Sequence, residues 1–376
     1  MHILIVPDSF KENLSATRVA AAIERGIKKV NPRINVHSIP FSDGGEGALT
    51  MLEKHLKGKR VSCKTVDPLG RHISADYFRF DDKKTAWIEL SQAAGLALLK
   101  KEERSPCSCT TYGTGLQIKH AIDHGCTKII LGIGGSATND GGAGIFQALG
   151  GQLLDKDLKE LHPGGAALAK LHKIILPKGY KNIEWQLACD VENPLLGQLG
   201  ATRVYGPQKG ASAGDIALLE HSLTHYAHCI EKQLDCKIDE LLGGGAAGGT
   251  AAGIHAFFNA KLTPGFDLLA SLLDLEKEIK KADLILTAEG KIDAQSLQGK
   301  VPVSVARLAK KHLIACIGLV GKIEGELSPL YRAGFSGIFS IQNGPMTLEE
   351  SMAQSEELLE KSAAQVVTYH QNICRI

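Results

Sequence analysis

Between Gly132 and Gly142 the sequence combines five glycines with four short polar side chains, directly after an apolar run from Ile129 to Ile133. Glycines allow the backbone to approach a ligand closely and to turn its N–H groups towards that ligand. Short polar side chains can also cap a following helix, whose N-terminus attracts negative charge. The stretch therefore predicts a phosphate-binding loop between a strand and a helix, with these contacts: Gly134, Gly135, Ser136, Thr138 and Asn139.

Acidic and basic side chains recur just after other predicted strands. The motifs PDSFK, FSDGGEG and CDVENP each follow such a strand and contribute, in chain order, Asp8, Ser9, Lys11, Asp43 and Asp190. In open α/β sheets, ligands bind at the carboxyl ends of the strands. We therefore expect these side chains to lie at ligand-binding edges of parallel sheets.

The elements that must position these residues alternate between strands and helices at both ends of the chain. A helix is predicted from Ala16 to Val30, because apolar residues recur at helical spacing after the N-cap residue Ser15. From Val61 onwards the pattern changes to short alternating strands. We predict an α/β protein with two domains. One is a discontinuous, doubly wound parallel-sheet domain of residues 1–62 plus 280–376, and the other is an inserted mixed α/β domain of residues 63–279, with the ligand cleft between them.

Composition limits the class of partner. The 376 residues include 43 Lys and Arg against 41 Asp and Glu, without a long run of one sign, which argues against a nucleic-acid or membrane partner. Nine scattered cysteines without a C-x-x-C motif indicate reduced thiols. The opening MHILIVPDSF is typical of a strand and not of a signal peptide. We predict a cytoplasmic protein with a small-molecule substrate, and a homo-oligomer stays open.

Known nucleotide-binding motifs match only weakly. The pattern Gly132-x-Gly134-x-x-Ala137, with Asp155 after the next strand, resembles a dinucleotide fingerprint, but Asp140-Gly141-Gly142 prevents a helix from starting cleanly at Ala137. No Gly-Lys pair is followed by Ser or Thr, so a Walker A motif is absent. Two alternatives stay open: a nicotinamide-dependent oxidoreductase that uses this loop, and a non-catalytic sugar-acid sensor.

The motifs together resemble one family. PDSFK, SDGGEG, GGSATNDGG, CDVENP, GPQKG and AEGKIDAQS, in this order and spacing, are similar to those of the bacterial glycerate kinases, which phosphorylate glycerate with ATP. The resemblance covers essentially the whole chain and implies a discontinuous flavodoxin-like domain with an inserted domain. It also implies functional roles for Lys291, Asp293, Gln295 and Ser296 in AEGKIDAQS. The sequence departs from the family at Ala288, where glycine is common.

The candidate residues suit this reaction. Phosphoryl transfer to a hydroxy acid needs donors for the phosphates, carboxylates that hold Mg²⁺, a cation for the substrate carboxylate and an acceptor for the hydroxyl proton. Lys11, Lys300 and Arg71 suit anions, while Asp190 and Asp293 suit the roles of base and metal ligand in either order. We therefore predict a glycerate kinase that uses ATP and Mg²⁺, with 2-phosphoglycerate favoured over 3-phosphoglycerate as its product. The predicted catalytic residues are Asp190, Asp293 and Lys300, and the predicted substrate contacts are Asp8, Ser9, Lys11, Asp43, Arg71, Lys291, Gln295 and Ser296.

Overall fold

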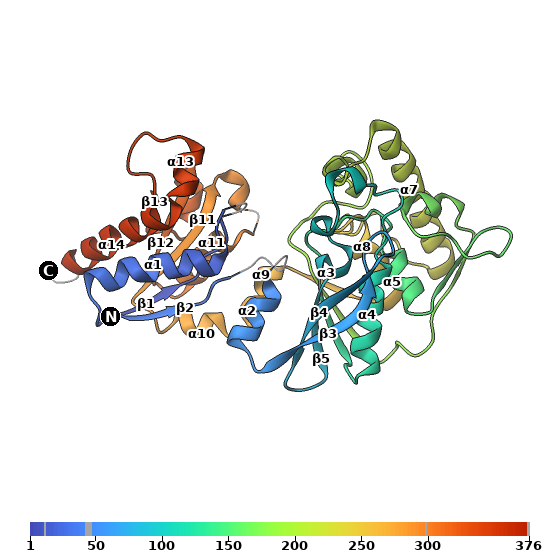
Figure 1. Ribbon diagram of the computed structural model, residues 1–376, viewed down its shortest axis with the longest axis horizontal. Coiled ribbons are helices and arrows are strands. Elements are labelled where there is room, and N and C mark those ends of the chain that lie inside the picture. The colour runs from blue at the N-terminus through green and yellow to red at the C-terminus, as the bar shows by residue number, and fades with distance from the viewer. Residues whose placement is uncertain (11–12, 42–46, 298, 374–376) are drawn as a thin grey trace. The chain divides into compact units, whose positions relative to one another are not determined.

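The structure is a computed structural model that describes residues 1–10, 13–41, 47–297 and 299–373. The chain forms two compact units, which we call unit 1 (residues 1–43 and 266–376) and unit 2 (residues 44–265). Unit 1 is discontinuous, and Figure 1 shows its N-terminal segment in blue beside its C-terminal segment in red. No helix in the described ranges combines the length and the apolar character needed to cross a membrane.

Unit 1 contains a sheet of five parallel strands. Across the sheet they are β13 (Gly337–Ser340), β12 (Ala315–Ile323), β11 (Leu284–Ile292), β1 (His2–Ile5) and β2 (Asn35–Ser38). Counted along unit 1, this order is 2-1-3-4-5, which is the flavodoxin-like arrangement. The predicted doubly wound parallel sheet is confirmed, with β1 and β11 as direct neighbours through the pair Ile3 and Leu284.

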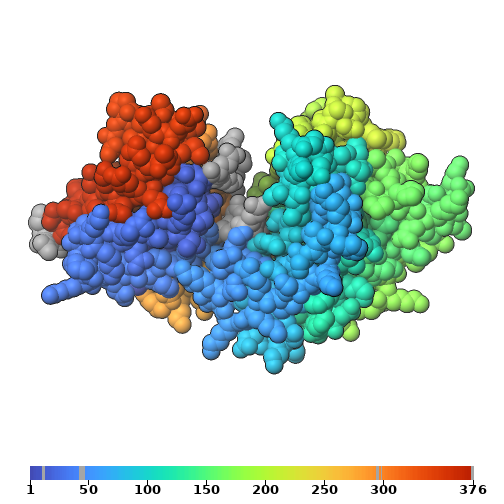
Figure 2. Space-filling model, in the orientation of Figure 1, coloured from blue at the N-terminus to red at the C-terminus, as the bar shows by residue number. Residues whose placement is uncertain are grey.

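Helices cover this sheet because its strands are apolar on both faces. Ile3 and Ile5 of β1 join a core cluster with residues of α1 (Ala16–Val30) and α14 (Ser355–Ile373), while Leu4, which points to the other face, is also fully buried. Arg25 of α1 pairs with Glu356 of α14 at 3.0 Å, and Figure 2 shows the blue and red segments in direct contact. The other helices of unit 1 are α9 (Gly265–Leu272), α10 (Leu275–Ile279), η5 (Ala294–Leu297), α11 (Val301–Lys311), α12 (Ser328–Ala333) and α13 (Leu348–Ala353).

Unit 2 contains a mixed sheet of six strands. Across the sheet they are β10 (Lys261–Thr263), β9 (Glu184–Ala188), β6 (Lys128–Gly132), β5 (Thr85–Glu89), β4 (His72–Phe80) and β3 (Gly58–Val66). Strand β4 pairs antiparallel with both β3 and β5, whereas β5, β6, β9 and β10 pair parallel. Glu89, Gly132, Ala188 and Thr263 form one row across the four parallel strands. The loops that follow these residues therefore begin at one edge.

The remaining elements of unit 2 surround this sheet. They are α2 (Ala48–His55), α3 (Ser91–Ala94), η1 (Leu96–Leu98), η2 (Lys101–Glu103), α4 (Tyr112–Asp123), α5 (Ala143–Ala148), the hairpin of β7 (Gln152–Leu154) and β8 (Lys173–Ile175), η3 (Gly165–Lys170), α6 (Ala201–Tyr205), η4 (Pro207–Lys209), α7 (Ala213–Leu234) and α8 (Thr250–Phe258). The glycine-rich tract before α8 is a packed loop. A Cβ at Gly248 would lie 2.1 Å from the carbonyl oxygen of Thr138, so only glycine allows the two loops to approach this closely.

Two local features differ from the expectation. The chain divides between the units after residues 43 and 265, not near 62 and 280, because α2 packs on β3, β4 and β5 and the Leu49 N–H donates to Glu89 Oε1 at 2.7 Å. The sequence pattern predicts a strand from Asp283 to Thr287 followed by a loop that begins AEGKID, but β11 extends to Ile292, because it stays paired with β12 through Lys291 and Lys322. The segment from Ala288 to Ile292 is therefore strand and not loop.

Candidate functional site

In unit 1, predicted residues lie where the strand order reverses between β1 and β11. Asp8 and Ser9 follow β1, and the Asp8 N–H donates to the carbonyl oxygen of Ala288 in β11 at 2.8 Å. The Ser9 N–H donates to Asp8 Oδ1 at 2.7 Å, and the Asp8 side chain is largely buried. Doubly wound sheets bind ligands at this switch point. The fold therefore brings Asp8 and Ser9 to the edge where a ligand is expected.

Asp293 lies in the same edge region, directly after β11. Its N–H donates to Ser296 Oγ at 3.2 Å, and the Ser296 N–H donates back to Asp293 Oδ1 at 3.2 Å. Lys291 Nζ lies 3.0 Å from Asp293 Oδ2 and 2.8 Å from Glu324 Oε2, and these two carboxylates raise the pKa of Lys291. Asp293 is thus a partly buried carboxylate that hydrogen bonds and one ion pair hold in place.

Lys300 stands at the N-cap of α11 and reaches back to β11. Its Nζ lies 2.6 Å from Oε1 of Glu289, a residue that is almost fully buried. Glu289 is a candidate that the sequence analysis missed. The available signal was an acid beside Gly290 in AEGKID, but the interpretation of this segment as a loop gave no reason to pair it with Lys300.

Three predicted substrate contacts are not settled by the structure. Lys11 and Asp43 lie outside the described residues, and so does the side chain of Gln295, whose backbone is part of η5. Arg71, in unit 2, is engaged by two carboxylates: its Nε lies 2.5 Å from Asp67 Oδ2 and its Nη1 lies 2.8 Å from Glu103 Oε1. A role for Arg71 in substrate binding stays a prediction.

The predicted phosphate loop connects β6 to α5 and begins with Gly134, which is partly exposed, and Gly135, which is exposed. Gly135 is exposed and has a φ of +69°, a conformation that favours glycine. Its carbonyl oxygen accepts from the Leu96 N–H at 2.8 Å. The N–H of Ala137, two residues later, donates to the carbonyl oxygen of Ala94 at 2.8 Å. These bonds fix Gly134 and Gly135 at the surface of the sheet edge.

The middle of the same loop is buried. Thr138 and Asn139 are fully inaccessible, and Asn139 Nδ2 donates to Thr202 Oγ1 at 3.0 Å. The glycine-rich tract before α8 covers this part, as the close approach of Gly248 to Thr138 shows. Direct phosphate contact by these two side chains stays a prediction, whereas Gly135 is exposed, Gly134 is partly exposed, and Ser136 beside them is 8% exposed.

Asp140 caps the helix that follows. Its Oδ2 accepts from the Thr111 N–H at 2.8 Å and from the Gly144 N–H at 3.3 Å in the first turn of α5. Burial raises the pKa of the Asp140 carboxyl, although these hydrogen bonds oppose the shift. Of the four polar residues that could cap α5, Asp140 is the one that bonds to its first turn.

Lys209 is the second candidate that the sequence analysis missed. It lies in η4, is only 2% exposed, and donates from Nζ to Ser136 Oγ and to the Thr138 carbonyl oxygen, both at 2.7 Å. Burial lowers the pKa of Lys209 to about 7, and the charge of Asp140 acts in the opposite direction. The motif GPQKG marked a turn, but nothing in it showed that its lysine enters the interior.

Asp190 follows β9, the strand next to β6. Its Oδ1 accepts from the Gly265 N–H at 2.7 Å, and its side chain is partly buried. Because Gly132 and Ala188 are register partners, the glycine loop and the Asp190 loop begin side by side. Unit 2 therefore brings an anion-binding type of loop and a fixed carboxylate to one sheet edge.

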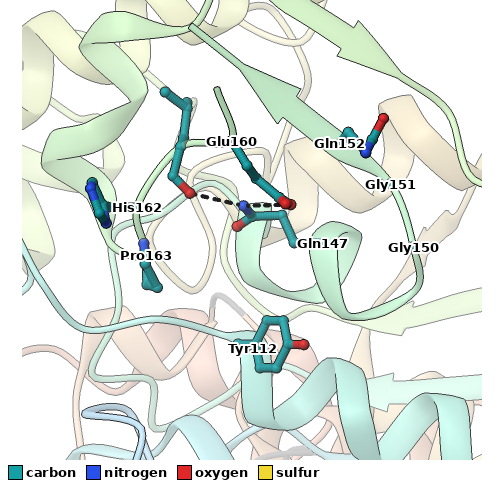
Figure 3. Close-up of a pocket in the computed structure, with 9 residues that line it drawn as sticks. Tyr112, Gln147, Gly150, Gly151, Gln152, Glu160, His162 and Pro163 are labelled. Carbon is teal, nitrogen blue, oxygen red and sulfur yellow. Dashed lines mark hydrogen bonds between the residues drawn. The ribbon is translucent and has the colours of Figure 1, made fainter. Parts of the chain in front are cut away.

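A separate pocket of about 460 Å³ lies elsewhere in unit 2. Figure 3 shows the Gln147 amide directed towards Glu160, with Tyr112 below. Gln147 Nε2 donates to Glu160 Oε1 at 3.4 Å and to the Leu161 carbonyl oxygen at 3.2 Å. None of the predicted site residues lines this pocket.

Comparison with known proteins decides the family. Residues 3–371 match the model of the glycerate kinase family. The chain belongs to the glycerate kinase family. It is 42% identical over 367 residues to a glycerate kinase from Halalkalibacterium halodurans, with 97% of each chain covered. It is also 42% identical over 354 residues to glycerate 2-kinase from Escherichia coli, with 93% of each covered.

A solved structure agrees with this glycerate kinase assignment. A crystal structure from Salmonella typhimurium LT2, for which glycerate kinase 2 is the proposed identity, is 39% identical and superposes over 100% of both chains with a TM-score of 0.86. The predicted family and α/β fold are therefore confirmed. Membership of this family makes the protein a kinase and implies the use of ATP.

Proposed function

We propose that the protein phosphorylates D-glycerate with ATP and Mg²⁺ and that 2-phosphoglycerate is the product. The observation that carries the proposal is the shared edge in unit 2, where a glycine loop and the carboxylate of Asp190 follow adjacent parallel strands. The names of the relatives support glycerate as the substrate, and that of the Escherichia coli relative supports the 2-position.

The chain supplies donors for the phosphates. Gly134 and Gly135 would present backbone N–H groups, and Ser136 would add a hydroxyl. ATP supplies the phosphoryl group. Since the loop is tied to Ala94 and Leu96 by backbone hydrogen bonds, it needs little reorganisation on binding.

Asp190 and Asp293 would take the roles of base and metal ligand. Carboxylate oxygens are the ligands that Mg²⁺ prefers, and this ion is commonly held by one or two carboxylates together with phosphate oxygens and waters. The described residues contain no group of three or more acidic, histidine or cysteine side chains suited to a metal, which agrees with such a sparse donor set. Asp190 and Asp293 are each held by a backbone N–H, from Gly265 and Ser296, so either can hold a proton or an ion in a fixed position.

The cations of unit 1 would bind the carboxylate of glycerate. Lys291 belongs to β11 and Lys300 reaches back to it, and each keeps part of its side chain exposed. Asp8 and Ser9 at the switch point would accept from or donate to the substrate hydroxyls. Lys11 and Asp43 stay in the proposed substrate set because they follow predicted strands, and Gln295 and Ser296 because of the family resemblance.

The oxidoreductase alternative lacks one expected feature. Asp155, the acid that would bind a ribose in a dinucleotide site, instead accepts from the N–H groups of Asp157 at 2.8 Å and Lys159 at 2.9 Å in a tight turn.

An assay of ADP release with D-glycerate, run with and without Mg²⁺, tests the proposal. We expect ADP release that requires both glycerate and Mg²⁺. Phosphorus NMR of the product should give 2-phosphoglycerate. Nicotinamide reduction by a hydroxy acid would favour the oxidoreductase, and glycerate binding without turnover would favour a sensor; either result would overturn the proposed function.

A further inference from the structure

Lys209 occupies an unusual place beneath the exposed part of the glycine loop. Two of the three hydrogens of its ammonium are directed at the loop itself, one at Ser136 Oγ and one at the Thr138 carbonyl oxygen. Its side chain is 2% exposed, so solvent does not replace these bonds. Burying an ammonium group is costly unless its hydrogens find acceptors, and here both acceptors belong to the same loop.

The bond to Ser136 determines what its hydroxyl can do. A serine oxygen that accepts from an ammonium group still carries its own hydrogen, and that hydrogen must point away from the ammonium. Ser136 is 8% exposed and follows the exposed Gly135. The small exposed part of Ser136 therefore lies where the phosphates are proposed to bind. A hydroxyl oriented in this way is a donor, and phosphate oxygens are acceptors.

We propose that Lys209 is a positioning residue that turns the Ser136 hydroxyl into a hydrogen-bond donor for a nucleotide phosphate. This rests on the proposed function, because it deepens the role of the glycine loop. Lys209 acts through Ser136 and the Thr138 carbonyl and does not itself contact the nucleotide.

The proposal makes phosphate binding depend on the charge of Lys209. A neutral amine has a lone pair, can accept from the Ser136 hydroxyl, and then leaves the serine lone pairs facing the phosphate. The charged or titratable groups that act on Lys209 are Asp140 in the loop and Cys109 in the loop before α4, and both favour the ammonium form. Because the pKa of Lys209 is lowered to about 7 by burial, a rise in pH above neutrality removes the ammonium and weakens phosphate binding.

The test measures binding of ADP by calorimetry at pH 6.5 and pH 9 for the wild type, Lys209→Met and Ser136→Ala. Lys28→Met is the matched control, since Lys28 also donates to two backbone carbonyls, those of Pro32 and Ile34, but in unit 1. ADP itself also changes its charge between these pH values. Affinities are therefore compared between variants at the same pH, where this change affects every protein equally. Glycerate-dependent ADP release by the wild type is measured in parallel.

At pH 6.5 we expect Lys209→Met and Ser136→Ala each to weaken ADP binding by roughly 10- to 100-fold, the range for a hydrogen bond to a charged group. At pH 9 the advantage of the wild type over both variants should fall to about threefold or less, and Lys28→Met should follow the wild type. If Lys209→Met does not fold, Ser136→Ala decides alone, because it keeps Lys209 and removes only the hydroxyl.

Equal ADP affinity of the wild type and Ser136→Ala, or a difference that does not change with pH, would overturn the proposal. If either occurs while the wild type turns over glycerate, the proposed function stands and only the role of Lys209 is wrong. If the wild type binds ADP with the expected pH dependence but shows no turnover of glycerate, the substrate assignment fails and the role of Lys209 stands. A wild type that binds no ADP would overturn both.

Discussion

The sheet edges of the two units carry their charges differently. In unit 1 the charged groups include side-chain pairs near the surface, such as Lys291 with Asp293 and with Glu324. In unit 2 the edge presents backbone and small hydroxyl groups, while the cation Lys209 is kept in the interior. Exposed ion pairs contribute little stability and can exchange partners at small cost. A buried lysine under a tied loop cannot do so, and it acts by fixing geometry.

The difference indicates a division of work between the units. Partner exchange suits a small substrate carboxylate, which can replace one carboxylate of an existing pair. A fixed loop suits phosphates, whose binding benefits from donors that are already in place. Mutations in the two edges should therefore change different kinetic constants, and the following predictions test this.

The largest effect is expected at the two carboxylates. Asp190→Asn and Asp293→Asn should each lower kcat by roughly 10²- to 10⁴-fold, because a base or metal ligand is lost. Asparagine can still accept from the N–H groups of Gly265 and Ser296, so thermal unfolding should change little. Asp123→Asn, on an exposed Lys119 pair, serves as the control. Near-normal turnover in both site variants would refute the assignment.

The next effect concerns the glycine pair. Gly135→Val should raise KM for ATP by about tenfold or more, because a β-branched residue resists a φ of +69° and blocks close approach. Gly125→Val is a matched control, with a φ of +93° and open space for the side chain. Both variants should lose stability through strain, on the order of 1 to 3 kcal/mol. A similar KM for ATP in the two variants would show that the loop does not bind the nucleotide.

A smaller effect is expected at Lys300. Lys300→Met should raise KM for glycerate by about tenfold, and it should also destabilise unit 1, since Glu289 is left in the interior without its cation. The double variant Lys300→Met with Glu289→Gln should recover much of the stability but not the KM. Steady-state kinetics and urea unfolding separate the two consequences. Recovery of KM in the double variant would mean that Lys300 acts only by neutralising Glu289.

The last prediction concerns how the stability of the folded protein changes with pH. Lys209 has a pKa of about 7 in the folded protein, below its ordinary value of 10.5. Between these values the unfolded chain binds more protons than the folded one, so the contribution of Lys209 to the free energy of unfolding rises with pH. Relative to Lys209→Met, the wild type should gain stability from pH 7 to pH 9 in urea unfolding. The same pH dependence in both proteins would contradict this shift.

Local sequence signals predicted much of the fold. The helix α1 has the predicted bounds, because a cap at Ser15 and helical apolar spacing are local properties, and Ser15 Oγ accepts from the Arg18 N–H at 3.4 Å. The strand-end loops were also placed correctly, since Asp8, Asp190 and the glycine loop each follow a strand. The parallel pairing of β1 with β11 followed from the repeated strand–helix pattern at the two ends of the chain.

Features that depend on distant partners could not be predicted in this way. The burial of Thr138 and Asn139 is caused by the glycine-rich tract around Gly248, far along the chain. Lys209 is important because it bonds to Ser136, and Glu289 because it pairs with Lys300. Only the folded chain brings these partners together. No local pattern distinguishes a lysine that enters the interior from one on the surface.

The discontinuity of unit 1 has a consequence for synthesis on the ribosome. Strand β1 leaves the ribosome first, but its central neighbour β11 is made only after the whole of residues 44–265. Until then β1 has only β2 to pair with, and two strands alone are marginally stable in water. Unit 2 can therefore fold during translation, while the apolar faces of β1 stay incompletely covered until β11 and α14 are made.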